Sequence, residues 1–302
     1  MTVADPTYID DPIFTAPSQE WSAHRLELRA VASEPPALAR SESRLASVAS
    51  SVLWALIGFA VVGGLWQLAT MFADKLPTPG ETLSTIRTMA ADPFYDNGPN
   101  DKGIGLRLWS SLGRVVKGWG LAVVLGVPLG LFMGASKRAW RAANPVVQLL
   151  RPVSPLAWFP IWLVYFQQSD KAAVWTIFIT ALWPTVLNTA AGAAAIPDDH
   201  RRVARVFKFG RVAYARHVLI PDSLPAIVTG LRLSMGIAWM VIVATEMLSG
   251  GVGAGTFIWD AYNASNLSQV AAAIVFIGIV GFVLDLGFLR LGRAVAIEKE
   301  QS

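Results

Sequence analysis

The feature that most constrains this chain is a series of apolar stretches long enough to cross a lipid bilayer. A hydrocarbon core of about 30 Å needs a helix of roughly 20 predominantly apolar residues. With 54% hydrophobic and only 15% charged residues, the composition places the whole chain in the membrane class. The sequence predicts an all-α membrane protein with about six transmembrane helices, at residues 51–73, 106–135, 145–166, 171–196, 224–249 and 267–289.

Basic residues cluster next to the ends of these spans. Loops that carry an excess of lysine and arginine stay in the cytoplasm. Six spans place all four basic clusters on that side, at residues 40–44, 137–141, 201–216 and 290–299. The N- and C-termini are therefore expected in the cytoplasm. Because the basic residues flank apolar spans, we expect the lipid bilayer as their environment and no nucleic acid as a partner.

The expected spans divide the chain into three parts. Residues 1–48 are polar and interrupted by prolines, which indicates a cytoplasmic arm that is partly disordered or amphipathic. Residues 49–297 form the transmembrane domain, with an external loop at 74–105 and a cytoplasmic loop at 197–222, and 298–302 form a short tail. In the external loop, Thr78, Pro79 and Glu81 match a capping box, so we expect a short surface helix there.

Two of the spans have unusual compositions. The second carries Gly118, Gly120, Gly126, Gly130 and Gly134, whose spacing favours a close approach to another helix. The third is interrupted by prolines, which remove backbone donors and kink helices. In a membrane such a kink persists where protein or a watery cavity satisfies the freed carbonyls. We therefore expect the third span, with prolines at 145, 152, 155 and 160, to line a cavity.

Few ionisable residues lie within the spans, and each is a candidate for the route of a transported ion. Arg151 interrupts the third span, either as part of an anion route or as a base whose head reaches the cytoplasmic interface. Glu246 and Asp285 would repel an anion, so we expect each to pair with a base or a helix end. The candidate pathway residues are Arg151, Arg114, Lys117, Trp158, Asn188 and Glu246.

Known catalytic and cofactor motifs are absent from the sequence. It has no phosphate-binding loop, no HExxH motif and no cysteine, and its three histidines lie far apart. The glycine string at 250–255 follows no strand, and we interpret it as a flexible helix end. We expect no catalytic residue, metal or cofactor in this chain, so energy for uphill transport would come from elsewhere. A self-sufficient channel or carrier would need inverted repeats, and a membrane enzyme would need a cluster of carboxylates or histidines; neither is evident.

The segment 198–231 is a basic loop of helical character between two spans. Val203, Val206, Phe207 and Gly210 recur at helical spacing. The other face carries Arg201, Arg202, Arg205 and Lys208. A short amphipathic helix, a glycine break and a second basic helix that ends at a proline favour a docking element for a soluble partner.

This loop resembles the cytoplasmic docking motif of permease subunits of ATP-binding-cassette importers. The family pattern begins with an acidic residue and two alanines, followed after three residues of any type by a glycine. After nine further residues of any type come an apolar residue, one residue of any type, a leucine and a proline. Here the matching positions are Arg202, Val203, Ala204, Lys208, Val218, Ile220 and Pro221. Arginine thus replaces the acidic residue and lysine replaces the glycine. The stretches "SLGRVVKGWGLAVVLGVPLG", "RPVSPLAWFPIWLVYF" and "EMLSGGVGAGTFIWDAYN" extend the resemblance over roughly residues 50–295.

The resemblance implies a type I importer permease fold with a coupling helix between spans four and five. It implies a homodimer in the bacterial plasma membrane, two cytoplasmic ATPase subunits that use ATP and magnesium, and an external solute-binding protein. The implied cargo is a small inorganic anion, with nitrate or nitrite first and bicarbonate, cyanate or a sulfonate such as taurine as alternatives. The implied ATPase contact comprises Arg201, Arg202, Val203, Ala204, Arg205, Phe207, Lys208, Gly210 and Arg211.

Overall fold

The computed structural model describes residues 44–73, 75–99 and 101–301, and the expected N-terminal arm lies almost entirely outside them. The regular structure of the described residues is helical apart from one isolated bridge between Asp96 and Lys102, so the expected all-α class is confirmed. The elements are α2 (Arg44–Phe72), α3 (Pro79–Ala91), α4 (Ile104–Ala135), α5 (Lys137–Leu150), α6 (Pro155–Phe166), α7 (Ser169–Ala194), α8 (Asp198–Val206), α9 (Arg211–Tyr214), η2 (Ala215–Leu219), α10 (Ile220–Ser249), α11 (Ala254–Asn263) and α12 (Leu267–Gln301).

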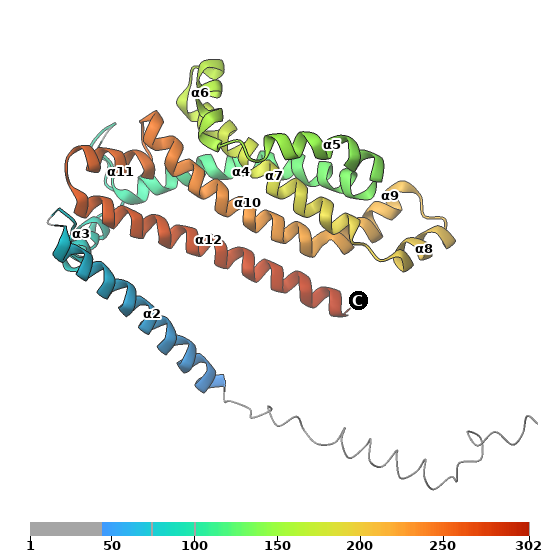
Figure 1. Ribbon diagram of the computed structural model, residues 1–302, viewed down its shortest axis with the longest axis horizontal. Coiled ribbons are helices and arrows are strands. Elements are labelled where there is room, and N and C mark those ends of the chain that lie inside the picture. Colours follow the sequence, from blue (N-terminus) through green and yellow to red (C-terminus); the bar gives the residue numbers. More distant parts are fainter. Residues whose placement is uncertain (1–43, 74, 100, 302) are drawn as a thin grey trace, which may run out of the picture. The chain divides into compact units, whose positions relative to one another are not determined.

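The chain forms two units, which divide between Leu65 and Trp66. The described part of the first unit is the N-terminal portion of α2; the stretch Ser50–Phe72 of this helix is long and apolar enough to cross a membrane. In the second unit, α4, α7 and α10 pack against one another, and α12 packs along α10 (Figure 1). The helices α3 and α11 lie at one end of this bundle and α8 and α9 at the other (Figure 1). We call these the α11 end and the α8 end.

Glycines on α4 bring it against α7. A Cβ atom added at Gly118 would lie 2.5 Å from the carbonyl oxygen of Val174, and one at Gly134 would lie 2.2 Å from that of Ala190. Gly126 and Gly130 make the same kind of contact with Thr185 and Thr189. The predicted close approach is therefore present, although Gly120 has no neighbour within 4 Å. Since the contacts advance along both helices together, α4 and α7 run parallel.

The connection between α4 and α7 spans the length of the bundle. Because these two helices run parallel, the segment from the end of α4 to the start of α7 must return to the end of the bundle where α4 begins. Two helices do this, α5 and α6, which meet at an angle of 91°. The structure thus has five long apolar helices and a sixth crossing built from this bent pair among the described residues.

The third span was expected as a single kinked helix at 145–166, but the structure has two separate helices there, α5 and α6. Pro145 and Pro160 lie inside α5 and α6, and the break falls between them at 151–154. Pro155 excludes the helical conformation from the residue before it, and Ser154 accordingly has ψ of 132°. Pro155 is then favourable as the first residue of α6, because its missing N–H would have no helical partner there.

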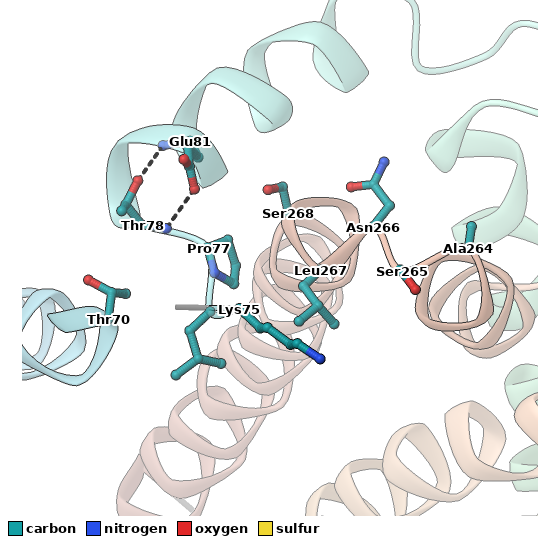
Figure 2. A pocket seen from close by; sticks show the side chains of 11 residues that line it. Thr70, Lys75, Pro77, Thr78, Glu81, Ala264, Ser265, Asn266, Leu267 and Ser268 are labelled. Atoms are coloured by element: carbon teal, nitrogen blue, oxygen red, sulfur yellow. Dashed lines mark hydrogen bonds between the residues drawn. The ribbon is translucent and has the colours of Figure 1, made fainter. Parts of the chain in front are cut away.

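The connections at the α11 end follow their local sequence signals. Thr78 and Glu81 form both bonds of the predicted capping box at the start of α3 (Figure 2). Between α3 and α4, Lys102 bonds to Asp96, and this bond holds the pKa of the Asp96 carboxyl below its usual value.

At the C-terminal end of the described residues, α12 continues to Gln301, through the segment that was expected as a separate tail.

Candidate functional site

The connection between α7 and α10 presents an apolar surface at the α8 end. The helix α8 packs through Ala204, which is 4% exposed. Around it, four apolar side chains are more than half exposed and touch no core: Val203, Val206, Phe207 and Val212. We call these four residues the coupling surface. Their exposure on a structured connection is what a docking surface for another protein requires.

The arginines of this connection differ in what they contact. The Arg201 guanidinium donates to the carbonyl oxygens of Ala193 and Ala194, at 3.3 and 3.1 Å. It thereby caps the last turn of α7 and ties α8 to it. Arg202 lies 3.7 Å from Asp199 on the same helix, and Arg205 bonds to the Arg201 carbonyl; both are exposed. The expected contacts of these bases with an ATPase stay a prediction.

The break after α8 lies at Lys208, not at Gly210 as the sequence indicated. The N–H of Phe209 donates to the Ala204 carbonyl at 2.9 Å, and that of Lys208 donates to the Arg205 carbonyl at 3.1 Å. This pair of bonds is the Schellman ending of a helix, whose turning residue is usually glycine. Lys208 holds that place with φ of 50°, whereas Gly210 has φ of −66° and no neighbour within 4 Å. Lysine therefore occupies the left-handed conformation that the glycine of the family motif would adopt freely.

Replacing Lys208 with glycine is therefore expected to raise the thermal stability of the purified subunit. A residue with a Cβ atom loses about 1 kcal/mol in the left-handed conformation, and glycine does not. Lys208→Val should lower the melting temperature, because a β-branched side chain tolerates positive φ poorly. Gly210→Ala should change little at an open, ordinary φ. A clear loss of stability in Lys208→Gly would contradict this account.

The second basic helix expected after the turn continues directly into the fifth span. Pro221 has no N–H with which to bond four residues back. In the turn before it, the Ile220 N–H donates instead to the carbonyl of Ala215, five residues earlier. The short helix α9 therefore joins α10 through the π-helical turn η2. A movement of the coupling surface can thus pass along a nearly continuous helix.

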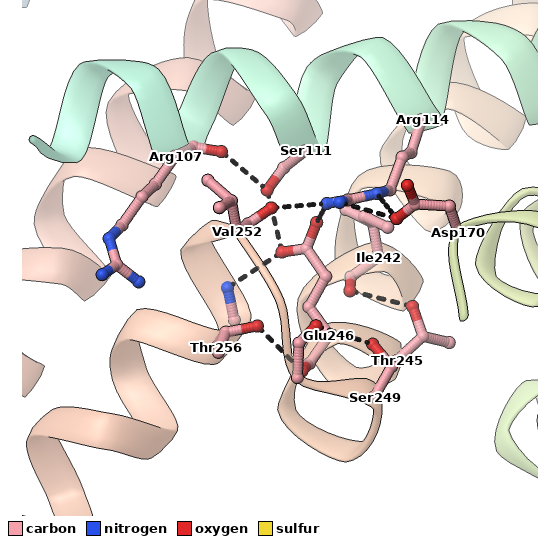
Figure 3. A network of polar contacts seen from close by, with 12 residues as sticks. Arg107, Ser111, Arg114, Asp170, Ile242, Thr245, Glu246, Ser249, Val252 and Thr256 are labelled. Carbon is pink, nitrogen blue, oxygen red and sulfur yellow. Dashed lines mark hydrogen bonds and ion pairs between the residues drawn. The ribbon is translucent and has the colours of Figure 1, made fainter. Parts of the chain in front are cut away.

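At the α11 end, a polar network surrounds Glu246, whose side chain is 1% exposed (Figure 3). Its carboxylate accepts from Arg114 Nη1 at 2.7 Å, from the Ser111 hydroxyl at 2.8 Å and from the Gly255 N–H at 3.0 Å. Arg114 also bonds to Asp170 at 2.8 Å and to the Val252 carbonyl at 2.8 Å. The network joins α4, α7, α10 and the start of α11.

The glycine string at 250–255 follows the end of α10, as expected, and its second half also has a structural role in this network. A Cβ atom at Gly253 would lie 2.3 Å from the Glu246 carboxyl carbon, and one at Gly255 would lie 2.0 Å from the Val243 carbonyl oxygen. Only glycine lets the backbone approach this closely. The start of α11 can then direct its N–H groups at the buried carboxylate.

The pairings expected for the two acidic residues within the spans are confirmed. Glu246 meets a base and a helix start, and Asp285 on α12 forms two bonds to Arg232 on α10, at 2.6 and 2.8 Å. Arg114 forms ion pairs with both Glu246 and Asp170, so its contacts hold α4 against α10 and α7. Sequence reasoning missed Asp170 and Ser111, because their partners lie 56 and 135 residues away in the chain.

The remaining candidate pathway residues lie in two places. Lys117 lines a surface cavity with Asp170 and Lys171 near the α11 end. Asn188 lies where α7 meets α10, and its amide donates to the Pro184 carbonyl at 2.8 Å. Arg151 and Trp158 lie together at the break between α5 and α6. They line a cavity of about 230 Å³ whose other walls are Val153, Pro155, Ile179, Thr180, Trp183, Pro184 and Ile237.

Residues 126–297 match the family model described as the binding-protein-dependent transport system inner membrane component. The chain belongs to this family. A nitrate import permease of Synechocystis is 43% identical over 81% of this chain and 89% of its own length. A bicarbonate transport permease of the same organism is 41% identical over 81% and 88%, and the taurine permease of Escherichia coli is 29% identical over 76% and 82%.

Solved structures agree on the fold. A chain of an inward-facing methionine transporter superposes with a TM-score of 0.59 at 17% identity, covering 64% of this chain and 95% of that one. A chain of a bacterial alginate importer superposes with a TM-score of 0.52 at 13% identity, covering 91% and 99%. The expected permease fold is confirmed, and the chain is a multi-pass protein of the inner membrane that acts as a transport subunit.

Proposed function

We propose that this chain is the membrane subunit of an ATP-driven importer for a small inorganic anion, with nitrate as the cargo. The observation that carries the proposal is the similarity to nitrate import permeases, at 42–44% identity over most of the chain. Bicarbonate permeases follow at 39–41%, so bicarbonate is the second candidate. The taurine permease is more distant.

In this proposal two copies of the chain form the passage, and two ATPase subunits bind the coupling surfaces from the cytoplasm. The ATPases use ATP and magnesium, this chain binds no cofactor, and an external binding protein delivers the anion at the α11 end. Both termini lie in the cytoplasm. Clusters of basic residues at the α8 end support this orientation, because such clusters remain on the cytoplasmic side.

The contacts within the chain suggest how ATPase movement opens the passage. Arg201 ties α8 to the end of α7, and α9 continues through η2 into α10. A displacement of the coupling surface therefore tilts two helices of the central bundle together. At the far end, the Glu246 network holds α10 to α4 and α11, so the bundle tilts as a body and its two ends open alternately.

The experiment that tests the proposal is uptake of isotopically labelled nitrate by liposomes that contain the permease, its ATPases and its binding protein. We expect uptake that needs ATP and all three components, with weak competition by bicarbonate. Uptake of bicarbonate but not nitrate would favour the second candidate. Transport by the permease alone would instead show a self-sufficient channel or carrier.

A further inference from the structure

The cavity at the break between α5 and α6 lies at mid-depth in the bundle. Its wall on α7 is formed by Ile179, Thr180, Trp183 and Pro184, which surround the centre of Ser169–Ala194. At 1.5 Å per residue, this centre is about 19 Å from either end of α7. Its wall on α10 is Ile237, close to the middle of that helix. Because α7 is long enough to cross a membrane, the cavity that Arg151 lines is far from both ends of that span.

Arg151 has no counter-charge at this depth among the residues that the structure describes. It forms no ion pair or side-chain hydrogen bond with any residue that the structure describes, and its side chain is exposed. By contrast, the arginines at 114 and 232 within the spans are both bonded to carboxylates. An unpaired guanidinium facing hydrocarbon is costly, so such a residue faces protein, water or an anion.

The other walls of the cavity carry no negative charge and offer hydrogen-bond donors, which suits an anion. No aspartate or glutamate among the described residues lines it. The guanidinium offers five N–H donors, and the indoles of Trp158 and Trp183 have donors only. Neither indole N–H makes a hydrogen bond with the described residues. A volume of about 230 Å³ exceeds the ~30 Å³ that one water occupies in the liquid, so a small hydrated anion has room.

We propose that the break between α5 and α6 is an anion-binding site midway through the passage. Arg151 supplies the charge of this site, and Trp158 and Trp183 form its walls and supply further donors. The chemical class of the ligand is a singly charged small oxyanion, which only accepts hydrogen bonds. The proposal rests on the proposed function for the identity of the anion, which is nitrate.

The absence of cysteine from the chain allows a direct test in the complete transporter with its ATPases and binding protein. Arg151→Cys is expected to reduce ATP-driven nitrate uptake about tenfold or more, the usual effect of losing a hydrogen bond to a charged group. Reaction with a positively charged aminoethyl thiosulfonate should then restore uptake, and a neutral methyl reagent should not. Nitrate should slow the reaction of the cysteine with either reagent.

Matched variants control for assembly and folding. Arg141→Cys lies on α5, the helix that precedes Arg151, at an exposed side chain, and this variant should transport normally before and after labelling. Should Arg151→Cys fail to assemble with the ATPases, Arg151→Lys and Arg151→Gln decide the question, because only lysine keeps the charge. We expect the lysine variant to retain most uptake and the glutamine variant to lose it.

Three results would overturn the anion site while leaving the proposed function intact. They are normal nitrate uptake by Arg151→Cys or Arg151→Gln, equal effects of the charged and neutral reagents, and no reaction of the cysteine with water-soluble reagents. If the unmodified transporter moves a different small oxyanion, the proposed cargo is wrong, and the same variants tested with that anion decide the site separately.

Discussion

Replacing Glu246 with alanine is expected to destabilise the folded subunit by about 3–5 kcal/mol, the usual cost of breaking a buried ion pair from one side. The change would remove the carboxylate that Arg114, Ser111 and the Gly255 N–H share. It would leave Arg114, whose side chain is 14% exposed, with Asp170 as its one charged partner among the described residues. Thermal unfolding of the purified subunit in detergent measures the effect.

Two further variants separate the charge of Glu246 from its shape. Glu246→Gln keeps the size and most of the hydrogen bonds, so it should cost less than alanine. The double variant Arg114→Ala, Glu246→Ala should be less destabilised than the sum of the two single changes. Each single change leaves the other residue of the ion pair buried without its partner, and the double change removes both charges.

The matched control lies in the connection between α3 and α4. Asp96, whose side chain is 53% exposed, forms an ion pair with Lys102 there, so Asp96→Asn should change the melting temperature little. If Glu246→Ala behaves like this control, or if the double variant shows no coupling, the network does not hold the α11 end together.

The lengths of the apolar stretches were enough to predict most of the architecture. The fourth span was expected at 171–196 and forms Ser169–Ala194, and the second was expected at 106–135 and forms Ile104–Ala135. Helices in a membrane must bond their backbone groups internally, so apolar length and helix length coincide. The cap of α3 was also predictable, because both of its hydrogen bonds join Thr78 and Glu81, which are three residues apart in the sequence.

Features that depend on contacts between distant segments were not predictable. Four prolines indicated a break in the third span but not its place, because a proline is tolerated inside a helix when packing supports it. Pro145 and Pro160 lie inside helices, and the break falls beside Pro152 and Pro155. The depth of Arg151 was also not predictable, because it follows from the packing of α6 against α7 and of α5 against α4.

The contacts of the glycine string and the turn at Lys208 were not predictable for a related reason. A glycine signals either flexibility or a close contact, and only the fold shows that Glu246 fills the space beside Gly253. At the other end, Gly210 drew attention as the break because glycine usually turns a helix end. The hydrogen bonds to the carbonyls of Ala204 and Arg205 place that turn at Lys208.

Replacing Phe207 with aspartate is expected to reduce ATP-driven uptake by about thirtyfold or more while the subunit still folds. Phe207 is 70% exposed, and its one ring contact among the described residues is with Phe209, at 6.4 Å between ring centroids, so the fold depends little on it. Aromatic residues at the centre of an interface typically contribute about 2 kcal/mol or more to binding. A charge placed among Val203, Val206 and Val212 would also oppose burial of that surface.

The measurement is copurification of the ATPases with the variant, together with nitrate uptake by the reconstituted complex. Phe94→Asp is the control, because Phe94 is 64% exposed but lies near the opposite end of the bundle, beside Gly105. The control should bind the ATPases normally, whereas Phe207→Asp should lose them. Phe207→Ala should lie between the two, because it shortens the side chain without adding a charge. Should Phe207→Asp retain both ATPase binding and uptake, force must enter the bundle elsewhere than through the coupling surface.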